Sequence, residues 1–511
     1  MRGRKILPME APVSWQKKFA WLVRAIRVFQ YDQDIRGTDF FASILNGNLK
    51  NTLRPATINR LENGDLEFTL ERCWAYEKSL DLPRNALADP YIFISRLAGV
   101  APKTALNKTR EVTHHELELF SRMSSGETLE PEDWLRLAYL YRNRPDLFIR
   151  SGRIKEMFFG ELMQDIGSYF EADERMAMEA LTVIGEDSIP YIQEYTQVQT
   201  MRYFNCAEVL GHVNSPRSWP ALRQMAMGDH HPLVLTTMVR SIIDSVKNGG
   251  VSAEDLSSGA KELTSRLVEM LKDPDEIYLV REEAIAFLRA SKMPLSRRDR
   301  VALDDSKEDI SQLLVRPVCL TRKDLTLAFS TEFRHVLSES NGVPPGCPIV
   351  VPGINHILYH GIFSEDRVER IAMGVLLAPW QLAGQVSEVL GKLLVTTVES
   401  KDYGLQRSLV RLITKIGHTS AWKYLSKFTS DLAADENTRY VAAWSLGGGV
   451  DPSDSSTLRT MYSKTSRPET RRVIITVAAR RGFADVLQIA CRDKDTSLAV
   501  EAGKELARLE H

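Results

Sequence analysis

The stretch RMAMEALTVIG (residues 175–185) has the composition of an apolar helix led by arginine, and related stretches follow it at nearly constant intervals. RYFNCAEVLG (202–211) and PLVLTTMVRSI (232–242) begin at successive steps of about 27 and 30 residues. Four later stretches, with starts 32, 32 and 26 residues apart, are RSLVRLITKIG (407–417), RYVAAWSLGGG (439–449), RRVIITVAARRG (471–482) and SLAVEAGKELARL (497–509). This repeat predicts stacked helical pairs, because no single pair buries both of its faces.

These repeated stretches resemble the second helices of HEAT repeats. Six of the seven begin with arginine or proline, and small residues stand where neighbouring helices would approach, at Ala180, Ala207, Ala443 and Ala478. The Trp-Leu-Gly-Tyr pattern of tetratricopeptide repeats is absent, and almost no strand-like alternation occurs. The resemblance implies an all-α chain containing an α-solenoid of HEAT-like repeats. An irregular bundle of unrelated helices remains the alternative.

The repeat series is interrupted at residues 318–364, which include SNGVPPGCPIVVPGINHILYHGIF. Proline and glycine are too frequent there for a helix interior, so we expect an irregular segment. It is either a long loop between repeats or a junction between two solenoid halves, at 113–317 and 365–511. Residues 1–100, ahead of a linker near 101–112, form a separate predicted domain.

Basic residues are concentrated at the N-terminus. The whole chain has 511 residues, with 66 Lys and Arg against 67 Asp and Glu, whereas residues 1–60 have eleven against four, a net charge of +7. A basic segment on a mildly acidic chain is expected when one small module contacts phosphates. The alternative is an uneven but purely solvated surface.

Four helices are predicted in this basic segment. The first, Trp15–Phe29, places Trp15, Phe19, Leu22, Ile26 and Phe29 on one stripe and leaves Lys17, Lys18, Arg24 and Arg27 off it. The second, Thr38–Asn46, begins with Thr38 as a cap, ends at Gly47, and buries Phe40, Phe41, Ile44 and Leu45. A fourth runs from Thr69 to Leu80.

The third helix, PATINRLEN (55–63), begins with Pro55, which tolerates the first helical position, and ends before Gly64. Ile58 and Leu61 would face inward. The outer face would then consist of Ala56, Thr57, Asn59 and Arg60, a small, polar and cationic set suited to base edges in a major groove.

The run T-I-N-R-L-E-N-G with the following Y-E-K-S-L-D-L-P resembles helices three and four of the lambda-repressor-like, or XRE, helix-turn-helix domain. The resemblance covers about residues 15–90 and implies that the third helix reads DNA, with Thr57, Asn59 and Arg60 at contacting positions. Lys50, Asn51, Thr52 and Arg54 would hold phosphates, or form an ordinary polar loop. The chain departs from the family in two respects: Thr38-Asp39 replaces a usual glutamine, and the turn at 47–54 is longer.

Catalytic motifs are absent. No phosphate-binding glycine loop, nucleophile elbow or H-E-x-x-H pattern occurs, and the five cysteines form no C-x-x-C pair, so we expect no enzyme, no cofactor and no metal. His356 and His360 are four apart but lack a catalytic glutamate between them. Cations between Arg459 and Arg492 pair with the next repeat or, alternatively, touch phosphates. No apolar stretch reaches the roughly 20 residues of a membrane span, which favours a cytoplasmic protein, associated with the nucleoid when bound to DNA.

The leading hypothesis is a bacterial, sequence-specific, DNA-binding transcriptional regulator that acts as a homodimer on double-stranded DNA. Its solenoid would bind a protein, peptide or small ligand. The second hypothesis is a HEAT-repeat scaffold for protein partners whose N-terminal module binds no DNA. The third is a HEAT-fold DNA-repair protein, although no aromatic and acidic constellation for base removal can be located.

Overall fold

The computed structural model describes residues 14–28, 35, 37–49, 51–106, 112–127, 129–149, 152–166, 171–196, 205–228, 232–247, 249–252, 254–256, 260–272, 278–291, 297, 300–301, 331–332, 350–364, 367–431, 433–434, 436–446, 455–465 and 467–509. Every regular element within these ranges is a helix. The predicted all-α class is therefore confirmed for this part of the chain. None of the helices described there is long and apolar enough to cross a membrane.

The chain divides into two compact units. The first comprises Met1–Phe68, Arg72–Pro90 and Ser311–His511, and the second comprises Thr69–Glu71 and Tyr91–Ile310. The N-terminal helices therefore belong to the same unit as the C-terminal helices, while the central helices form a unit of their own.

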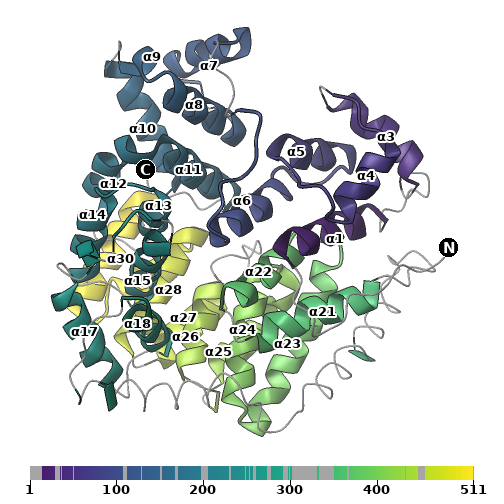
Figure 1. Ribbon diagram of the computed structural model, residues 1–511. Coiled ribbons are helices and arrows are strands. Elements are labelled where there is room, and N and C mark those ends of the chain that lie inside the picture. The colour runs from purple at the N-terminus through teal and green to yellow at the C-terminus, as the bar shows by residue number, and fades with distance from the viewer. Residues whose placement is uncertain are drawn as a thin grey trace. The chain divides into compact units, whose positions relative to one another are not determined.

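The central unit is built from two layers, in which each helix contacts the next helix of its own layer. One layer consists of α8 (Pro131–Asn143), α11 (Glu171–Ile184), α13 (Asn205–His212), α15 (Pro232–Lys247) and α18 (Tyr278–Ser291). The other consists of α10 (Gly152–Ile166), α12 (Ile189–Thr196), α14 (Ser218–Met227) and α17 (Lys261–Lys272). The short helix η2 (Gly185–Ser188) joins α11 to α12, and α7 (His114–Ser124) and α9 (Asp146–Ile149) contact both α8 and α10 (Figure 1).

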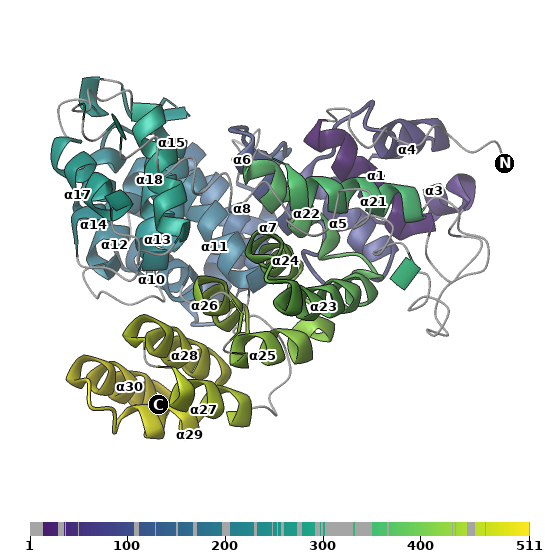
Figure 2. The same cartoon turned by 90° about the horizontal axis from the view of Figure 1, so that it is seen from below.

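The C-terminal helices of the first unit repeat this arrangement. One layer consists of α22 (Arg367–Leu377), α24 (Tyr403–Ile416), α26 (Glu436–Ser445), α28 (Pro468–Arg481) and α30 (Thr496–Leu509). The other consists of α23 (Ala383–Ser400), α25 (Trp422–Ser430), α27 (Ser455–Lys464) and α29 (Ala484–Ala490), with η4 (Thr419–Ala421) before α25. Figure 2 shows α28 and α30 side by side on one flank of α27 and α29. We call these helices, α22 to α30, the C-terminal array.

The predicted repeat is confirmed within each unit. In the described residues, each of the seven repeat stretches falls in a helix of one layer of its unit, namely α11, α13 and α15 in the central unit and α24, α26, α28 and α30 in the C-terminal array. Ala180, Ala207, Ala443 and Ala478 are fully buried. A Cβ added to Gly211 of α13 would lie 2.8 Å from the Cα of Ser241 in α15, so small residues do permit close approach of successive helices.

The expected irregular segment is wrong for residues 350–363. These residues form α21 (Val350–Phe363), which contacts α22 and α24. Pro352 is the third residue of this helix, where the missing N–H would have no intrahelical partner in any case. Gly361 lies where a Cβ would be 3.2 Å from the Cβ of Met373, so this glycine serves close packing. The rest of 318–349, apart from 331–332, lies outside the described residues.

The N-terminal head consists of α1 (Trp15–Val28), α3 (Thr38–Gly47), α4 (Pro55–Glu62) and α5 (Leu70–Ser79), followed by α6 (Ala88–Leu97). Four aromatic rings form its centre: Phe19 meets Phe68 with ring centroids 5.3 Å apart, Phe68 meets Tyr76 at 5.5 Å, and Phe41 meets Tyr76 at 5.1 Å. All three pairs are edge-to-face, the geometry that aromatic quadrupoles favour.

Candidate nucleic-acid interface

Helix α4 has one buried face and one open face. Pro55 occupies its first turn, as predicted, and Ile58 and Leu61 are fully buried. Gly64 follows the helix with a φ of +72°, so the expected left-handed stop is present. The spacing of three between the two buried residues fixes which side chains of α4 face outward.

The outward side chains of α4 are those that the sequence predicted. Ala56, Asn59 and Arg60 are exposed, and Thr57 is half-buried. The hydroxyl of Thr38, at the start of α3, donates to Oδ1 of Asn59 over 3.4 Å. This bond orients the carboxamide so that its NH₂ group remains available as a donor.

The loop before α4 presents three of the four predicted phosphate contacts at its surface. Asn51, Thr52 and Arg54 are exposed, and Lys50 lies outside the described residues. Asn46 closes this loop from α3, because its amide NH₂ donates to the carbonyl of Leu53 over 3.0 Å and its Oδ1 accepts from the Leu53 N–H over 2.7 Å. The amide of Asn46 therefore bonds both backbone groups of Leu53 and connects the end of α3 to the residue before Arg54.

A buried ion pair ties α4 to α1. Nε and Nη2 of Arg27 each donate to a different oxygen of Glu62 over 2.6 Å, and Tyr76 donates to the same carboxylate over 3.4 Å. Burial opposes the charge on Arg27, but the hydrogen bonds and charge of Glu62 outweigh it and raise the pKa of the guanidinium. Burial and the Glu62 charge also raise the pKa of Tyr76 well above its usual value. Such bidentate geometry fixes the angle between the two helices.

Two of the cations expected on the surface of α1 are buried. Arg27 is 2% exposed, and Lys18 is 4% exposed and paired with Glu369 of α22. They are buried because α1 packs on two sides, against α4 and against α22. The positive charge on the surface of the head is thus smaller than the sequence count indicates.

Two expectations for α3 are also wrong. Phe40 is 47% exposed, although its neighbour Phe41 is fully buried, because the buried stripe of this helix runs through Phe41 and Leu45. The N-cap is Gly37 and makes no side-chain bond, so Thr38 does not cap α3. Its hydroxyl bonds to Asn59 instead.

A feature that sequence reasoning missed is the role of Glu77 in α5. Its side chain is buried, with 4% exposure. Its carboxylate accepts the backbone N–H groups of Asn85, Leu87 and Ala88 over 3.1, 2.7 and 2.7 Å. Glu77 therefore satisfies the open N-terminus of α6, which stabilises the carboxylate despite burial.

Other candidate sites are explained by structure. His360 lies 3.2 Å from Glu369, and no group of three metal-binding side chains occurs among the described residues. Arg459 pairs with Asp485 of α29, Arg471 with Asp493 between α29 and α30, and Arg472 with Glu501 of α30. The interpretation of these arginines as contacts between repeats is therefore favoured over phosphate binding.

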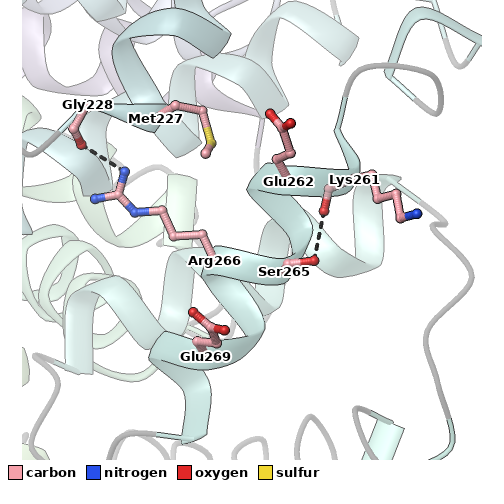
Figure 3. Close-up of a pocket in the computed structure, with 7 residues that line it drawn as sticks. All are labelled: Met227, Gly228, Lys261, Glu262, Ser265, Arg266 and Glu269. Carbon is pink, nitrogen blue, oxygen red and sulfur yellow. Dashed lines mark hydrogen bonds between the residues drawn. The ribbon is translucent and has the colours of Figure 1, made fainter.

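The central unit contains an open groove of about 660 Å³ between the end of α14 and α17 (Figure 3). Arg266 points to the end of α14, where it donates to the carbonyls of Ala226 and Gly228 over 2.8 Å each. Glu262 pairs with Arg223. Arg266 and Glu262 of the groove are thus used in holding the two helices together.

No protein-family model matches the chain, and no curated protein matches it. Among solved structures, the chain is similar to the crystal structure of Kap121p, with 11% sequence identity and a TM-score of 0.19. The alignment covers 97% of this chain and 49% of that one, so the chain spans about half the length of that protein. A TM-score this low supports no argument about function.

Proposed function

We propose that the chain is a sequence-specific, DNA-binding transcriptional regulator that inserts α4 in the major groove of a duplex. The observation that carries the proposal is the division of α4 into two faces. Ile58 and Leu61 are buried, whereas Asn59 and Arg60 are exposed with Ala56 beside them. A small helix face with donors and little bulk fits a groove about 12 Å wide.

Each outward side chain has a distinct task in this proposal. Arg60 donates to O6 and N7 of guanine, and Asn59 donates through the NH₂ that Thr38 leaves available. The methyl groups of Ala56 and Thr57 contact thymine methyls. Lys50, Asn51, Thr52 and Arg54 hold the adjacent phosphates and set the depth of the helix.

We also propose that the chain acts as a homodimer, because two paired heads would read two half-sites about 34 Å apart. The helical layers of the two units then offer surfaces for a protein, peptide or small ligand that controls DNA binding. Control by such a ligand is separable from the DNA contact itself.

The second candidate is a scaffold for protein partners whose head contacts no DNA. Stacked helical layers favour it, because such arrays present extended surfaces to protein ligands. The two candidates differ in what the open face of α4 does.

Selection from a random duplex pool with the full chain tests the proposal. We expect enrichment of one motif, and we expect the variant Asn59→Ala/Arg60→Ala to lose it while keeping its helical content. Lys427→Ala, which removes an exposed cation from α25, is the matched control and should enrich the same motif. Selection of no motif by the unaltered chain would contradict DNA reading and favour the scaffold.

A further inference from the structure

Helix α1 contacts more than the head. Beyond its contact with α4, it packs against α22. The rings of Trp21 and Trp380 meet edge-to-face at 6.5 Å, and the side-chain amide of Gln381 donates to the carbonyl of Ile26 over 3.0 Å. Figure 1 shows α1 lying directly on α22. One helix is therefore shared between the head and the C-terminal array.

Glu369 of α22 is the polar centre of this contact. Its Oε1 accepts from Lys18 of α1 and lies 3.2 Å from Nδ1 of His360 in α21. Its Oε2 accepts from the hydroxyl of Ser364 over 2.6 Å. Both carboxylate oxygens are thus used, and three segments of the chain meet at one side chain.

The pairing of Lys18 with Glu369 favours one arrangement of α1 on α22. Lys18 is 4% exposed, so an ammonium without Glu369 would be buried and unpaired, an arrangement that proteins rarely tolerate. The contact also includes the ring pair Trp21–Trp380 and the hydrogen bond from Gln381. The Lys18–Glu369 pair, with its ammonium buried and its carboxylate partly exposed, favours one arrangement of α1 on α22, because sliding either helix would separate the charges.

The same helix continues the connection to α4. Arg27 of α1 holds Glu62 of α4 through two hydrogen bonds, and the start of α1 lies against Gly64, where a Cβ would be 2.9 Å from the Cα of Lys17. A change in the position of α1 must therefore displace α4. The route from α22 to the open face of α4 passes through two ion pairs, the partly buried Lys18–Glu369 and the buried Arg27–Glu62.

We infer that Glu369 is a positioning residue that couples the C-terminal array to the DNA-reading face, so that a rearrangement of α21 and α22 changes how α4 is presented. The regulatory part of this inference rests on the proposed function. The contact of α1 with α22 through Lys18 and Glu369, which we call the joint, does not rest on it.

Hydrogen exchange of the full chain without DNA tests the joint. Glu369→Gln leaves Lys18 buried without a counter-charge, and we expect exchange in α1 to rise about tenfold or more. Glu388→Gln is the matched control, because it removes a carboxylate of α23 that pairs with Lys423, away from α1. Exchange in α1 should be unchanged in that variant.

A second variant separates coupling from general damage. Lys18→Met/Glu369→Gln removes the buried charge as well, so α1 should exchange more slowly than in Glu369→Gln alone. Exchange in α1 of Glu369→Gln equal to that of the unaltered chain would overturn the joint. So would a double variant that exchanges no more slowly than the single one.

The regulatory part is tested with the selected duplex. Coupling is reciprocal, so bound duplex should slow exchange in α21 and α22 of the unaltered chain, and Glu369→Gln should abolish that effect. Duplex binding without any change in α21 and α22 would overturn the coupling. Failure to bind any duplex would instead contradict the proposed function. Hydrogen exchange of α1 without DNA would still show whether Glu369 holds α1 on α22.

Discussion

Gly64 meets two requirements at one position. Its φ of +72° lies in the region that favours glycine, and a Cβ there would come within 2.9 Å of the backbone of Lys17. The residue ends α4 and at the same time admits the start of α1. A glycine two positions after Glu62 is thus needed for both the turn and the packing of the head.

Gly64→Ala should destabilise the head by about 1–3 kcal/mol, since it combines backbone strain with a steric clash. Local opening free energies of α1 and α4 from hydrogen exchange measure the effect. Gly47→Ala is the control, because no atom lies within 4 Å of a Cβ at that position. Equal opening free energies in the two variants would refute the packing role.

Ile58 and Asn59 are neighbours with opposite environments, the first fully buried and the second exposed. Ile58→Asp should unfold the head, because it buries an unpaired carboxylate at a cost of several kcal/mol. Asn59→Asp introduces the same charge and should leave the fold intact. Limited proteolysis within residues 14–97 distinguishes the two, and similar cleavage of both variants would mean that the face assignment is wrong.

At the scale of elements, α1 is the helix on which the head depends. It buries a cation toward each partner, Arg27 toward α4 and Lys18 toward α22. The aromatic contact between Trp21 and Trp380 adds apolar area on the second side. The faces of α1 that pack against α4 and against α22 are therefore covered, and a second copy of the head cannot dock on them.

Arg27→Met should destabilise the head by about 3–5 kcal/mol, because Glu62 would remain buried without its partner. Arg27→Met/Glu62→Gln removes both charges and should recover much of that loss. Chemical denaturation, followed by exchange in α4, gives the free energies. Additive losses in the double variant would show that the pair acts as two independent residues.

Acid should weaken the contact between α1 and α22. The hydrogen bond from His360 lowers the pKa of Glu369 from its ordinary 4.5, burial opposes this, and Lys18 and Ser364 reinforce it. A carboxylate with a lowered pKa stabilises the fold above its unfolded pKa, and that stability is lost as the pH falls below about 4.5.

Exchange in α1 of the unaltered chain should therefore accelerate as the pH is lowered from 5 to 3, after correction for intrinsic rates. In Glu369→Gln the corrected rates should change much less over that interval. The same pH dependence in both chains would assign the acid sensitivity to other groups.

At the scale of the whole molecule, the repeat was predictable because its signal is local. Each of the seven stretches carries an apolar face on a period near 30 residues, and the described part of each falls in a helix of one layer of its unit. The buried and open faces of α4 followed from the spacing of Ile58 and Leu61 in the same way. Helix α21 was missed because proline and glycine usually indicate the end of a helix. Pro352 is tolerated because it lies in the first turn, and Gly361 is required because a larger residue would crowd Met373.

The burial of Lys18 could not be predicted from local patterns. Its partner Glu369 is 351 residues away in the sequence, so nothing near α1 indicates that a second face is covered. The exposure of Phe40 is instead a local effect, because the buried stripe of α3 runs through Phe41 and Leu45 and leaves Phe40 on the open side. DNA binding itself remains a prediction, because it depends on a partner that only experiment supplies.

The most direct measurement is the ratio of affinities for the selected duplex and a scrambled duplex of equal length, at one salt concentration. We predict a high ratio for the unaltered chain and for Lys427→Ala, and a fall of about 10-fold or more for Arg60→Ala through the loss of one base contact. A ratio that Arg60→Ala leaves unchanged would contradict the claim that the open face of α4 reads DNA.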